Sequence, residues 1–228
     1  MISNIKIKNI TLVTSIIKPP NTALSYWYTR SIYSNETRFE QTKHTIQTIR
    51  NKIQDNLIIL VECSPLSKDE TNYFLHHTDI FINLYDDIDE RLNIHSASKA
   101  LGEGTMTKAA FKYLFENNIL YENFFKITGR YWLNENFNLQ NFETPKSVLK
   151  FIDNNPNNML TSLYNISYIH SILWYDYLLE STESMIACRN YEHIFADFIN
   201  TLPKDEYQSI NKIGVSGNWA PTGDLVDE

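Results

Sequence analysis

The residues best suited to chemistry lie in the segment Phe124–Trp132, where an apolar run ends in a glycine flanked by two cations. Lys126 precedes Gly129 by three residues, and Arg130 follows it directly. In open α/β sheets, ligands bind beyond the carboxyl ends of the strands. A glycine lets the backbone approach a ligand closely, and the planar guanidinium of arginine matches phosphate oxygens. The segment therefore predicts one wall of an anion site.

A second cluster opens the long helix expected over residues 98–117. Lys99, Gly102 and Glu103 lie at or near its first turn. A lysine there can reach an anion, and Gly102 places no side chain between helix and ligand. An acid in the first turn is also favoured by the helix dipole. Glu103 is therefore either a site residue or a simple helix-start acid.

Arg38 and Gln41 lie at the start of another helix, expected over residues 39–53. A cation in the first turn opposes the helix dipole, which favours a functional explanation such as contact with a phosphate. The alternative is a surface arginine paired with Glu36 or Glu40.

The elements that would position these side chains alternate along the chain. Apolar runs rich in β-branched residues predict strands, and helical spacing of apolar residues predicts helices. The expected strands cover residues 10–16, 57–61, 79–84, 123–127 and 159–166, and the expected helices cover residues 39–53, 68–76, 98–117 and 191–202. This alternation predicts an α/β fold with a mainly parallel central sheet flanked by helices. The long aromatic-rich loop over residues 18–37 is typical of functional loops.

Composition limits the class of protein. The 228 residues carry a net charge of −7, so nucleic-acid binding through a basic field is not expected. The two cysteines give no disulfide framework, and no apolar run approaches the ~20 residues of a membrane span. The N-terminus lacks the apolar core of a signal peptide. We expect a soluble cytoplasmic protein with one domain over residues 1–228, of which 214–228 form a partly mobile tail.

Common nucleotide-binding loops are missing from the chain. All six glycines lie at or beyond residue 102, so the first strand is followed by neither Gly-x-Gly-x-x-Gly nor a Walker A loop. A Rossmann dehydrogenase and a P-loop kinase are therefore poorly supported. The histidines also show no zinc-ligand spacing.

The order of four segments resembles the small GT-A glycosyltransferases, which use nucleotide sugars to build bacterial surface polysaccharides and some viral capsid glycans. The four segments are Leu12–Ser15, Glu36–Thr42, Lys99–Glu103 and Lys126–Tyr131. The resemblance implies a GT-A-like single domain. Residues 1–130 would form the nucleotide-sugar-binding half, and residues 131–213 the acceptor and catalytic half.

The resemblance also implies roles for individual residues. Thr14 and Ser15 would meet the base and ribose, and Glu62 would accept a hydrogen bond from them. Glu192 would be the carboxylate that deprotonates the acceptor in inverting transfer. Each has a simpler structural interpretation as a polar strand exit, a solvent-facing acid or a first-turn glutamate. The reserve candidates for the base are Asp176, Glu180 and Glu183. The full set of expected donor-binding residues is Thr14, Ser15, Arg38, Gln41, Glu62, Lys99, Glu103, Lys126, Gly129 and Arg130.

Metal use is where this chain departs from the metal-dependent GT-A enzymes. Those enzymes place an Asp-x-Asp pair for Mn²⁺ or Mg²⁺ where this chain has Thr128, Gly129 and Arg130. A fixed guanidinium can neutralise the leaving diphosphate instead, although Arg130 in a structural ion pair is the alternative. Asp87 and Asp89 form one Asp-x-Asp, but one element early, where a solvated acidic turn is the simpler explanation. We expect little or no dependence on divalent cations, with Asp87 and Asp89 as the alternative ligands.

Together these features predict a glycosyltransferase that moves a sugar from a UDP- or GDP-linked donor to a glycan or lipid-linked acceptor. Peripheral membrane association through the acceptor is an open option. A nucleotidyltransferase is one rival, but it would need a glycine-rich loop after the first strand, and that loop is absent. The other rival is a degenerate transferase that acts as a non-catalytic glycan-binding or assembly module.

Overall fold

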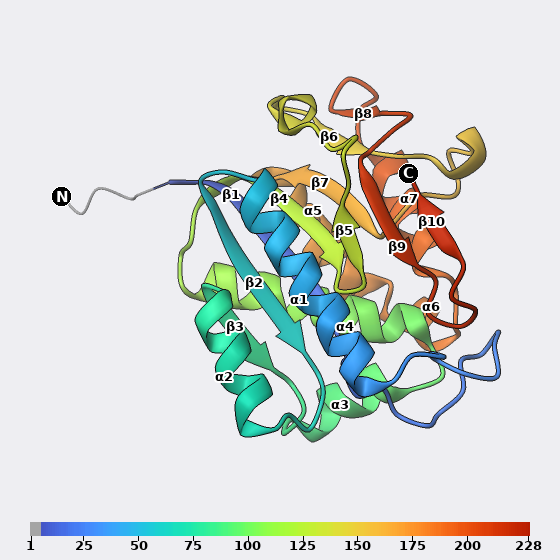
Figure 1. The fold of residues 1–228 in the computed structure, drawn as a ribbon. Helices are drawn as coiled ribbons and strands as arrows, with labels where there is room; N and C mark the ends of the chain where they lie inside the picture. The colour runs from blue at the N-terminus through green and yellow to red at the C-terminus, as the bar shows by residue number, and fades with distance from the viewer. Residues whose placement is uncertain (1–5) are drawn as a thin grey trace.

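The computed structural model describes residues 6–228 and builds them around a seven-stranded sheet (Figure 1). Its strands follow the order β3-β2-β1-β4-β7-β6-β8. The first four are parallel, β7 is antiparallel to both β4 and β6, and β6 is parallel to β8. The expected mainly parallel α/β sheet flanked by helices is confirmed. The strands are β1 (Ile7–Ser15), β2 (Asn56–Glu62), β3 (Ile80–Asn83), β4 (Tyr121–Thr128), β6 (Ser147–Leu149), β7 (Leu163–Ser167) and β8 (Tyr207–Ser209).

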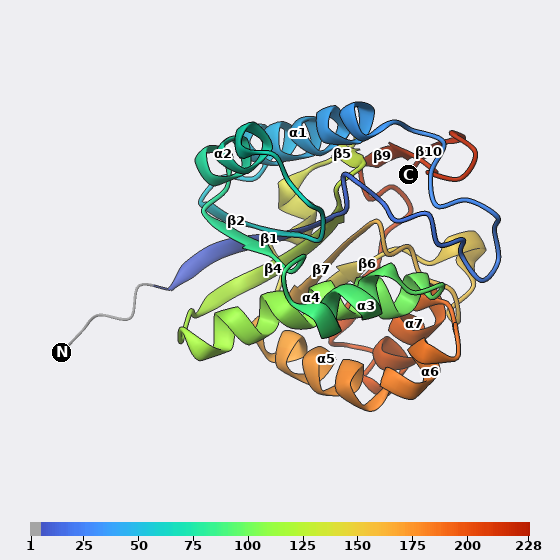
Figure 2. The same cartoon turned by 90° about the horizontal axis from the view of Figure 1, so that it is seen from below.

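Helices cover both faces of the sheet (Figure 2). In that view α1 and α2 lie on one face, and α3 to α7 lie on the other. Successive β1 residues therefore enter different cores: Leu12 packs with the α4 and α5 side chains, and Val13 packs with those of α1. Strands buried on both faces are continuously apolar, which is why the sequence pattern revealed them. The helices are α1 (Asn35–Lys52), α2 (Lys68–His77), α3 (Ile88–His95), α4 (Lys99–Glu116), α5 (Tyr168–Glu180), α6 (Thr182–Ile186) and α7 (Tyr191–Thr201), with short 3-10 helices η1 (Leu139–Phe142) and η2 (Ile152–Asn154).

A second, three-stranded sheet lies beside α1 (Figure 1). It contains β5 (Tyr131–Leu133), β9 (Val215–Asn218) and β10 (Leu225–Asp227), all antiparallel. Two of these strands fall in the segment 214–228, where composition gave no sign of regular structure. The loop between β9 and β10 contacts the long loop after β1, because the Ile32 amide donates to the Ala220 carbonyl at 2.9 Å.

Several elements differ from the sequence prediction. The acidic stretch that we expected to be a solvated turn instead starts α3, where Asp87 caps the helix by accepting from the Glu90 amide at 3.1 Å. Neither α5 nor α6 was expected, and the strand predicted over residues 159–166 starts only at Leu163. Across residues 6–228, no helix combines the length and apolarity needed to cross a membrane.

Candidate functional site

A cavity of about 190 Å³ opens at the carboxyl ends of β1 and β4, the edge of the sheet where the sequence predicted a site. We call it the first cavity. Its walls come from the end of β1, the loop that follows, the starts of α4 and α7, the β4–β5 turn and the loop between β9 and β10. The predicted site residues that line it are Thr14, Ser15, Arg38, Lys99, Glu103, Arg130 and Glu192. The predicted residues that do not line it are Gln41, Glu62, Lys126 and Gly129.

The end of β1 is held rigidly against its neighbours. Ser15 Oγ hydrogen-bonds Thr42 Oγ1 on α1 at 3.0 Å, and the Thr14 carbonyl accepts from the Gly129 amide at 2.9 Å. A Cβ atom at Gly129 would lie 3.1 Å from both the Thr14 oxygen and the Ser15 Cβ. This glycine therefore allows close approach of two backbone segments, whereas we had expected it to make room for a ligand.

The reason why a glycine occupies position 102 also differs from the expected one. It lines the first cavity, but a Cβ atom on it would lie 3.0 Å from the Ile94 carbonyl oxygen. The glycine thus permits close packing of α4 on α3. That packing brings the start of α4, with Lys99 and Glu103, to the cavity.

Arg38 is buried at the wall of the cavity, only 5% exposed. Its Nε and Nη2 atoms donate to the Ile16 carbonyl at 2.8 and 2.6 Å, which fixes the guanidinium at the end of β1. Burial, together with the nearby positive charge of Arg130, lowers the pKa of Arg38. A surface pair with Glu36 or Glu40, the alternative from the sequence, is not formed.

Arg130 faces the same cavity from the turn between β4 and β5. Its Nε atom is buried and has no hydrogen-bond partner among residues 6–228. Within that range neither Arg130 nor Arg38 forms an ion pair with an acid. A buried donor without a partner costs stability. Two neighbouring guanidinium groups that form no ion pair, one of them with such a donor, are suited to an anionic ligand.

Glu192, on the first turn of α7, forms an ion pair with Lys99 at the start of α4. Lys99 Nζ and Thr161 Oγ1 donate to Glu192 Oε1 at 2.9 and 3.1 Å. Burial alone would raise the pKa of Glu192, but the Lys99 charge, a backbone amide and the Thr161 hydroxyl lower it to about 2. Burial disfavours the charged form of Lys99, yet Glu192 and Glu103 raise the pKa of Lys99 above its ordinary value. Glu192 is thus firmly ionised.

A second ion pair joins Glu103, which lines the cavity, to Lys126, which does not. Lys126 is fully buried and donates to Glu103, to Thr128 Oγ1 at 2.9 Å and to the Thr161 carbonyl at 2.7 Å. Burial lowers the pKa of Lys126, and the Glu103 carboxylate counteracts this. Lys126 therefore holds Glu103 in place and does not itself reach the cavity. Thr161 connects the two pairs, since its carbonyl binds Lys126 and its hydroxyl binds Glu192.

Glu62 and Gln41 lie behind the cavity wall. Glu62 is completely buried, and its Oε1 atom accepts from the amides of Ile17 and Cys63 at 3.2 and 2.9 Å and from Ser64 Oγ at 2.5 Å. Burial raises the pKa of Glu62. These bonds order the chain where it leaves β1 and β2. The Oε1 atom of Gln41 is buried on α1 without a hydrogen-bond partner in the described chain.

Sequence reasoning missed several aromatic and cationic residues at the cavity mouth. Tyr26, Arg30 and Trp219 line the cavity from the loop after β1 and the loop between β9 and β10. Arg30 is anchored by bonds from its side chain to backbone carbonyls, including that of Thr22 at 2.8 Å. Trp219 packs edge-on against Trp27 at 5.2 Å between ring centroids. The aromatic content of the loop after β1 was the only feature of the sequence that pointed to this part of the cavity. No feature of the sequence pointed to Trp219.

Comparison with known proteins identifies the fold and leaves the family open. No family model matches the sequence, and no curated protein matches it significantly. The structure is similar to core-mannan synthase A from Aspergillus fumigatus in its Mn/GDP form, with a TM-score of 0.55 and 7% identity over 92% of this chain and 74% of that chain. It is also similar to the CTP:phosphocholine cytidylyltransferase LicC from Streptococcus pneumoniae, with a TM-score of 0.53 and 11% identity over 95% of both chains.

A further similar structure is the glycosyltransferase GlyE from Streptococcus pneumoniae, with a TM-score of 0.49 and 9% identity. The alignment covers 90% of this chain but only 45% of GlyE, so the chain spans less than half the length of that protein. The resemblance expected from the sequence is confirmed at the level of fold: this is a GT-A-like fold of the kind found in nucleotide-sugar glycosyltransferases and nucleotidyltransferases.

Proposed function

We propose that the protein is a glycosyltransferase that moves a sugar from a nucleoside-diphosphate donor to a glycan or lipid-linked acceptor, with inversion at the anomeric carbon. One observation carries the proposal. Arg38 and Arg130 converge at the carboxyl ends of β1 and β4 without an acidic partner in the described chain, and Arg130 keeps a buried Nε without a hydrogen bond. A diphosphate supplies the missing acceptors and the missing negative charge.

In this proposal the residues around the cavity have separate roles in the transfer. Arg38 and Arg130 hold the diphosphate and stabilise the charge that grows on it as the bond to the sugar breaks. The acceptor oxygen forms the new bond to the anomeric carbon, the bond to the β-phosphate oxygen breaks, and Glu192 takes the hydroxyl proton. Thr14 and Ser15 lie where the nucleoside would contact the end of β1.

Glu192 needs activation before it can act as a base. With a pKa of about 2 it binds a proton weakly at neutral pH. Lys99 lies at the start of α4 on the wall of the same cavity, where the donor diphosphate competes with Glu192 for its ammonium group. A diphosphate that draws Lys99 away raises the basicity of the carboxylate. Donor binding would thus prepare the base.

The acids around the first cavity do not fit a divalent cation. Glu103 and Glu192 each accept a hydrogen bond from a lysine ammonium. Residues 6–228 contain no group of three or more His, Cys, Asp or Glu side chains placed to hold a metal. Asp87 and Asp89 lie outside the cavity, at the start of α3. In this proposal the positive charge opposite the diphosphate comes from the arginines and Lys99.

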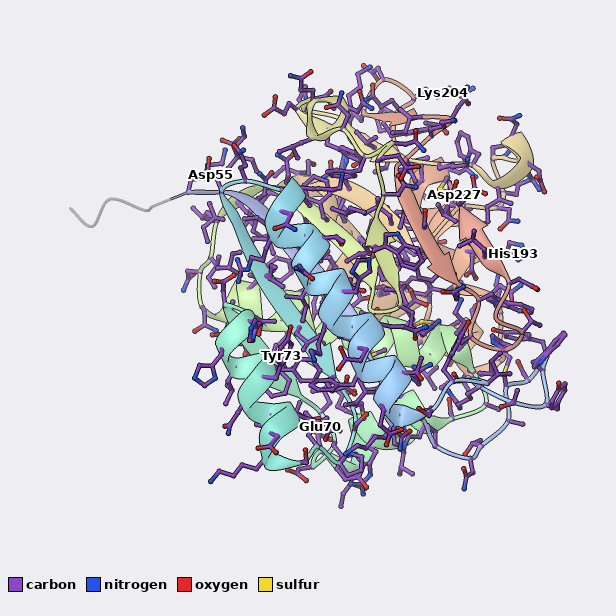
Figure 3. The ribbon with its side chains drawn as sticks, viewed as in Figure 1. Asp55, Glu70, Tyr73, His193, Lys204 and Asp227 are labelled. Atoms are coloured by element: carbon purple, nitrogen blue, oxygen red, sulfur yellow. The ribbon has the colours of Figure 1, made fainter. Side chains whose placement is uncertain are left out.

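A thermal-shift panel of UDP, GDP, CDP and ADP tests the donor site, each with and without Mn²⁺. A ligand that binds only the folded protein raises its melting temperature. We expect one nucleotide to do so without Mn²⁺, and Arg130→Gln to abolish the shift. The control is Lys204→Gln, which removes an exposed charge near β8 (Figure 3) from a residue that does not line the cavity. If no nucleotide stabilises the protein, the proposal is wrong, and the degenerate non-catalytic module becomes the better explanation.

A nucleotidyltransferase is the second candidate, because LicC aligns over 95% of both chains. Such an enzyme binds a nucleoside triphosphate and releases pyrophosphate. The chain that follows β1, Ile16 to Pro20, contains no glycine to wrap a triphosphate. Stabilisation by CTP or UTP, together with release of pyrophosphate from that triphosphate when a phosphorylated substrate is added, would favour this candidate. Stabilisation by a nucleoside diphosphate with no pyrophosphate release would favour the glycosyltransferase.

A further inference from the structure

A second cavity of about 320 Å³ adjoins the first. The two cavities share Tyr26, Lys99, Glu192 and Trp219, so the ion pair forms part of the wall between them. On its far side the second cavity is lined by the segment that joins α6 to α7, including Cys188. Taken together, the two volumes fall in the range of about 300–1,000 Å³ that is common for ligand sites.

The shared wall suits the chemistry of group transfer. A transfer base must contact the acceptor hydroxyl while the donor sugar lies within reach on its other side. We propose that the second cavity is the acceptor site and that it binds an uncharged sugar ring, with a hydroxyl of that ring directed at Glu192. The inference rests on the proposed function, since it presumes a donor in the first cavity.

The charges around the second cavity favour a neutral ligand. Lys99 is paired with Glu192 at 2.9 Å, or with the diphosphate once the donor is bound, and Arg189 is paired with Asp197 on α7. In the first cavity, by contrast, Arg38 and Arg130 have no acidic partner within residues 6–228. A phosphate is therefore better accommodated in the first cavity, and a ligand rich in hydroxyl groups in the second.

The remaining walls provide the contacts that a sugar needs. Tyr26 and Trp219 offer aromatic surface for the apolar face of a pyranose ring. Asn190 occupies the N-cap position of α7, yet its side chain makes no capping hydrogen bond there. Asparagine is favoured at that position because it normally caps. Here the amide lies at the cavity and is available to sugar hydroxyls.

Cys188 allows the second cavity to be filled without touching the first. It lines only the second cavity and is partly exposed, whereas Cys63 is completely buried. Burial also raises the pKa of the Cys63 thiol to about 12, which keeps it unreactive. Benzyl methanethiosulfonate should therefore place a benzylthio group on Cys188 as a mixed disulfide, with methanesulfinate as the leaving group. Dithiothreitol removes the group again.

The experiment measures two ligands before and after this labelling. Nucleoside diphosphate binding is followed by thermal shift, and binding of a panel of methyl pyranosides (gluco, galacto, manno and N-acetylglucosamine forms) by saturation-transfer NMR with the nucleotide present. We expect labelling to weaken pyranoside binding on the order of tenfold or more, equivalent to about 1.4 kcal/mol, and to leave the nucleotide shift unchanged. Dithiothreitol should restore pyranoside binding, and Cys188→Ser should be insensitive to the reagent.

The possible results separate this inference from the proposed function. If no nucleotide binds the unlabelled protein, the proposed function fails, and this inference fails with it. If a nucleotide binds but no pyranoside does, or if labelled protein binds a pyranoside as well as unlabelled protein, the acceptor assignment alone is overturned. Binding of a phosphorylated sugar in the second cavity in preference to a neutral one would also overturn it.

Discussion

The two ion pairs at the first cavity, Lys99 with Glu192 and Lys126 with Glu103, are connected through Thr161. Its carbonyl accepts from Lys126 and its hydroxyl donates to Glu192, so one residue between η2 and β7 touches both ion pairs. The side chain of Lys126 is sealed from water, whereas that of Lys99 is 38% exposed. An exposed partner can exchange one anion for another at low cost. A buried partner cannot exchange its anion in this way. Lys126 is therefore suited to a structural role, and Lys99 to ligand binding.

The acid stability of the protein should depend on Glu192. Its folded pKa of about 2 lies below the ordinary value of 4.5, so the ionised carboxylate stabilises the fold above about pH 4.5, and this is lost as the pH falls through about 2. The difference corresponds to a free energy of unfolding on the order of 3 kcal/mol. Urea unfolding should therefore show Glu192→Gln to be less stable than the parent protein at pH 7, with the gap narrowing below pH 4.5 and closing at about pH 2. The exposed Glu135→Gln serves as control. A gap that persists at low pH would contradict this assignment.

Lys126 lies near the carboxyl end of β4, where a ligand-binding role was expected, but its main contribution should be to stability. Lys126→Met leaves the Glu103 carboxylate buried without its cation, a change expected to lower the free energy of unfolding by about 4 kcal/mol. Adding Glu103→Gln removes the stranded charge and should recover a large part of that loss. The measurement is chemical denaturation of the two variants. A double variant no more stable than the single one would mean that packing, and not charge pairing, is the main role of Lys126.

At the scale of elements, the structure explains which predictions succeeded. The strands around β1 were visible because both faces are covered, which makes them continuously apolar. The acids at the start of α3 favoured a solvated turn, although a capping Asp87 followed by acids is also how a helix starts. The strands of the second sheet have only three or four residues, and pairing with distant partners such as Trp132 with Ser216 defines them. A local pattern cannot carry that information.

The second sheet should act on the first cavity through one close contact. Gly217 on β9 lies opposite Tyr131 on β5, and a Cβ atom on Gly217 would lie 2.3 Å from the Tyr131 ring. Gly217→Ala must therefore displace a side chain that lines the cavity. We expect a weaker thermal shift with the stabilising nucleotide, measured by titration. Gly104→Ala is the matched control, because its close contact is the flexible end of Met185, away from the cavity. An unchanged nucleotide affinity in Gly217→Ala would show that Tyr131 has no part in the site.

For the whole molecule, the sequence predicted which segments meet at the site but not how their charged side chains pair. Because parallel strands end at one edge of the sheet, the sequence predicted that Thr14, Glu62, Lys99 and Arg130 converge on one cleft. Thr14, Lys99 and Arg130 line the first cavity, whereas Glu62 lies behind its wall. The sequence could not predict that Lys126 turns inward to Glu103, or that Lys99 meets Glu192 from the other half of the chain. Such pairs depend on side-chain directions across helices and strands distant in sequence.

The two halves expected from the resemblance should unfold as one unit. The boundary near residue 130 falls between β4 and β5, yet β4 pairs along its length with β7 of the second half, and Phe124 and Tyr164 share one core. Calorimetry should therefore give a single transition.

A nucleotide at about 100 times its dissociation constant adds about 2.7 kcal/mol to the free energy of unfolding. For a chain of this size, that raises the midpoint temperature by about 5–10 °C. Because Lys99 and Glu192 come from different halves, the whole transition should move. Two transitions, of which the nucleotide moves only one, would mean that the halves are independent and that the cavity belongs to one of them.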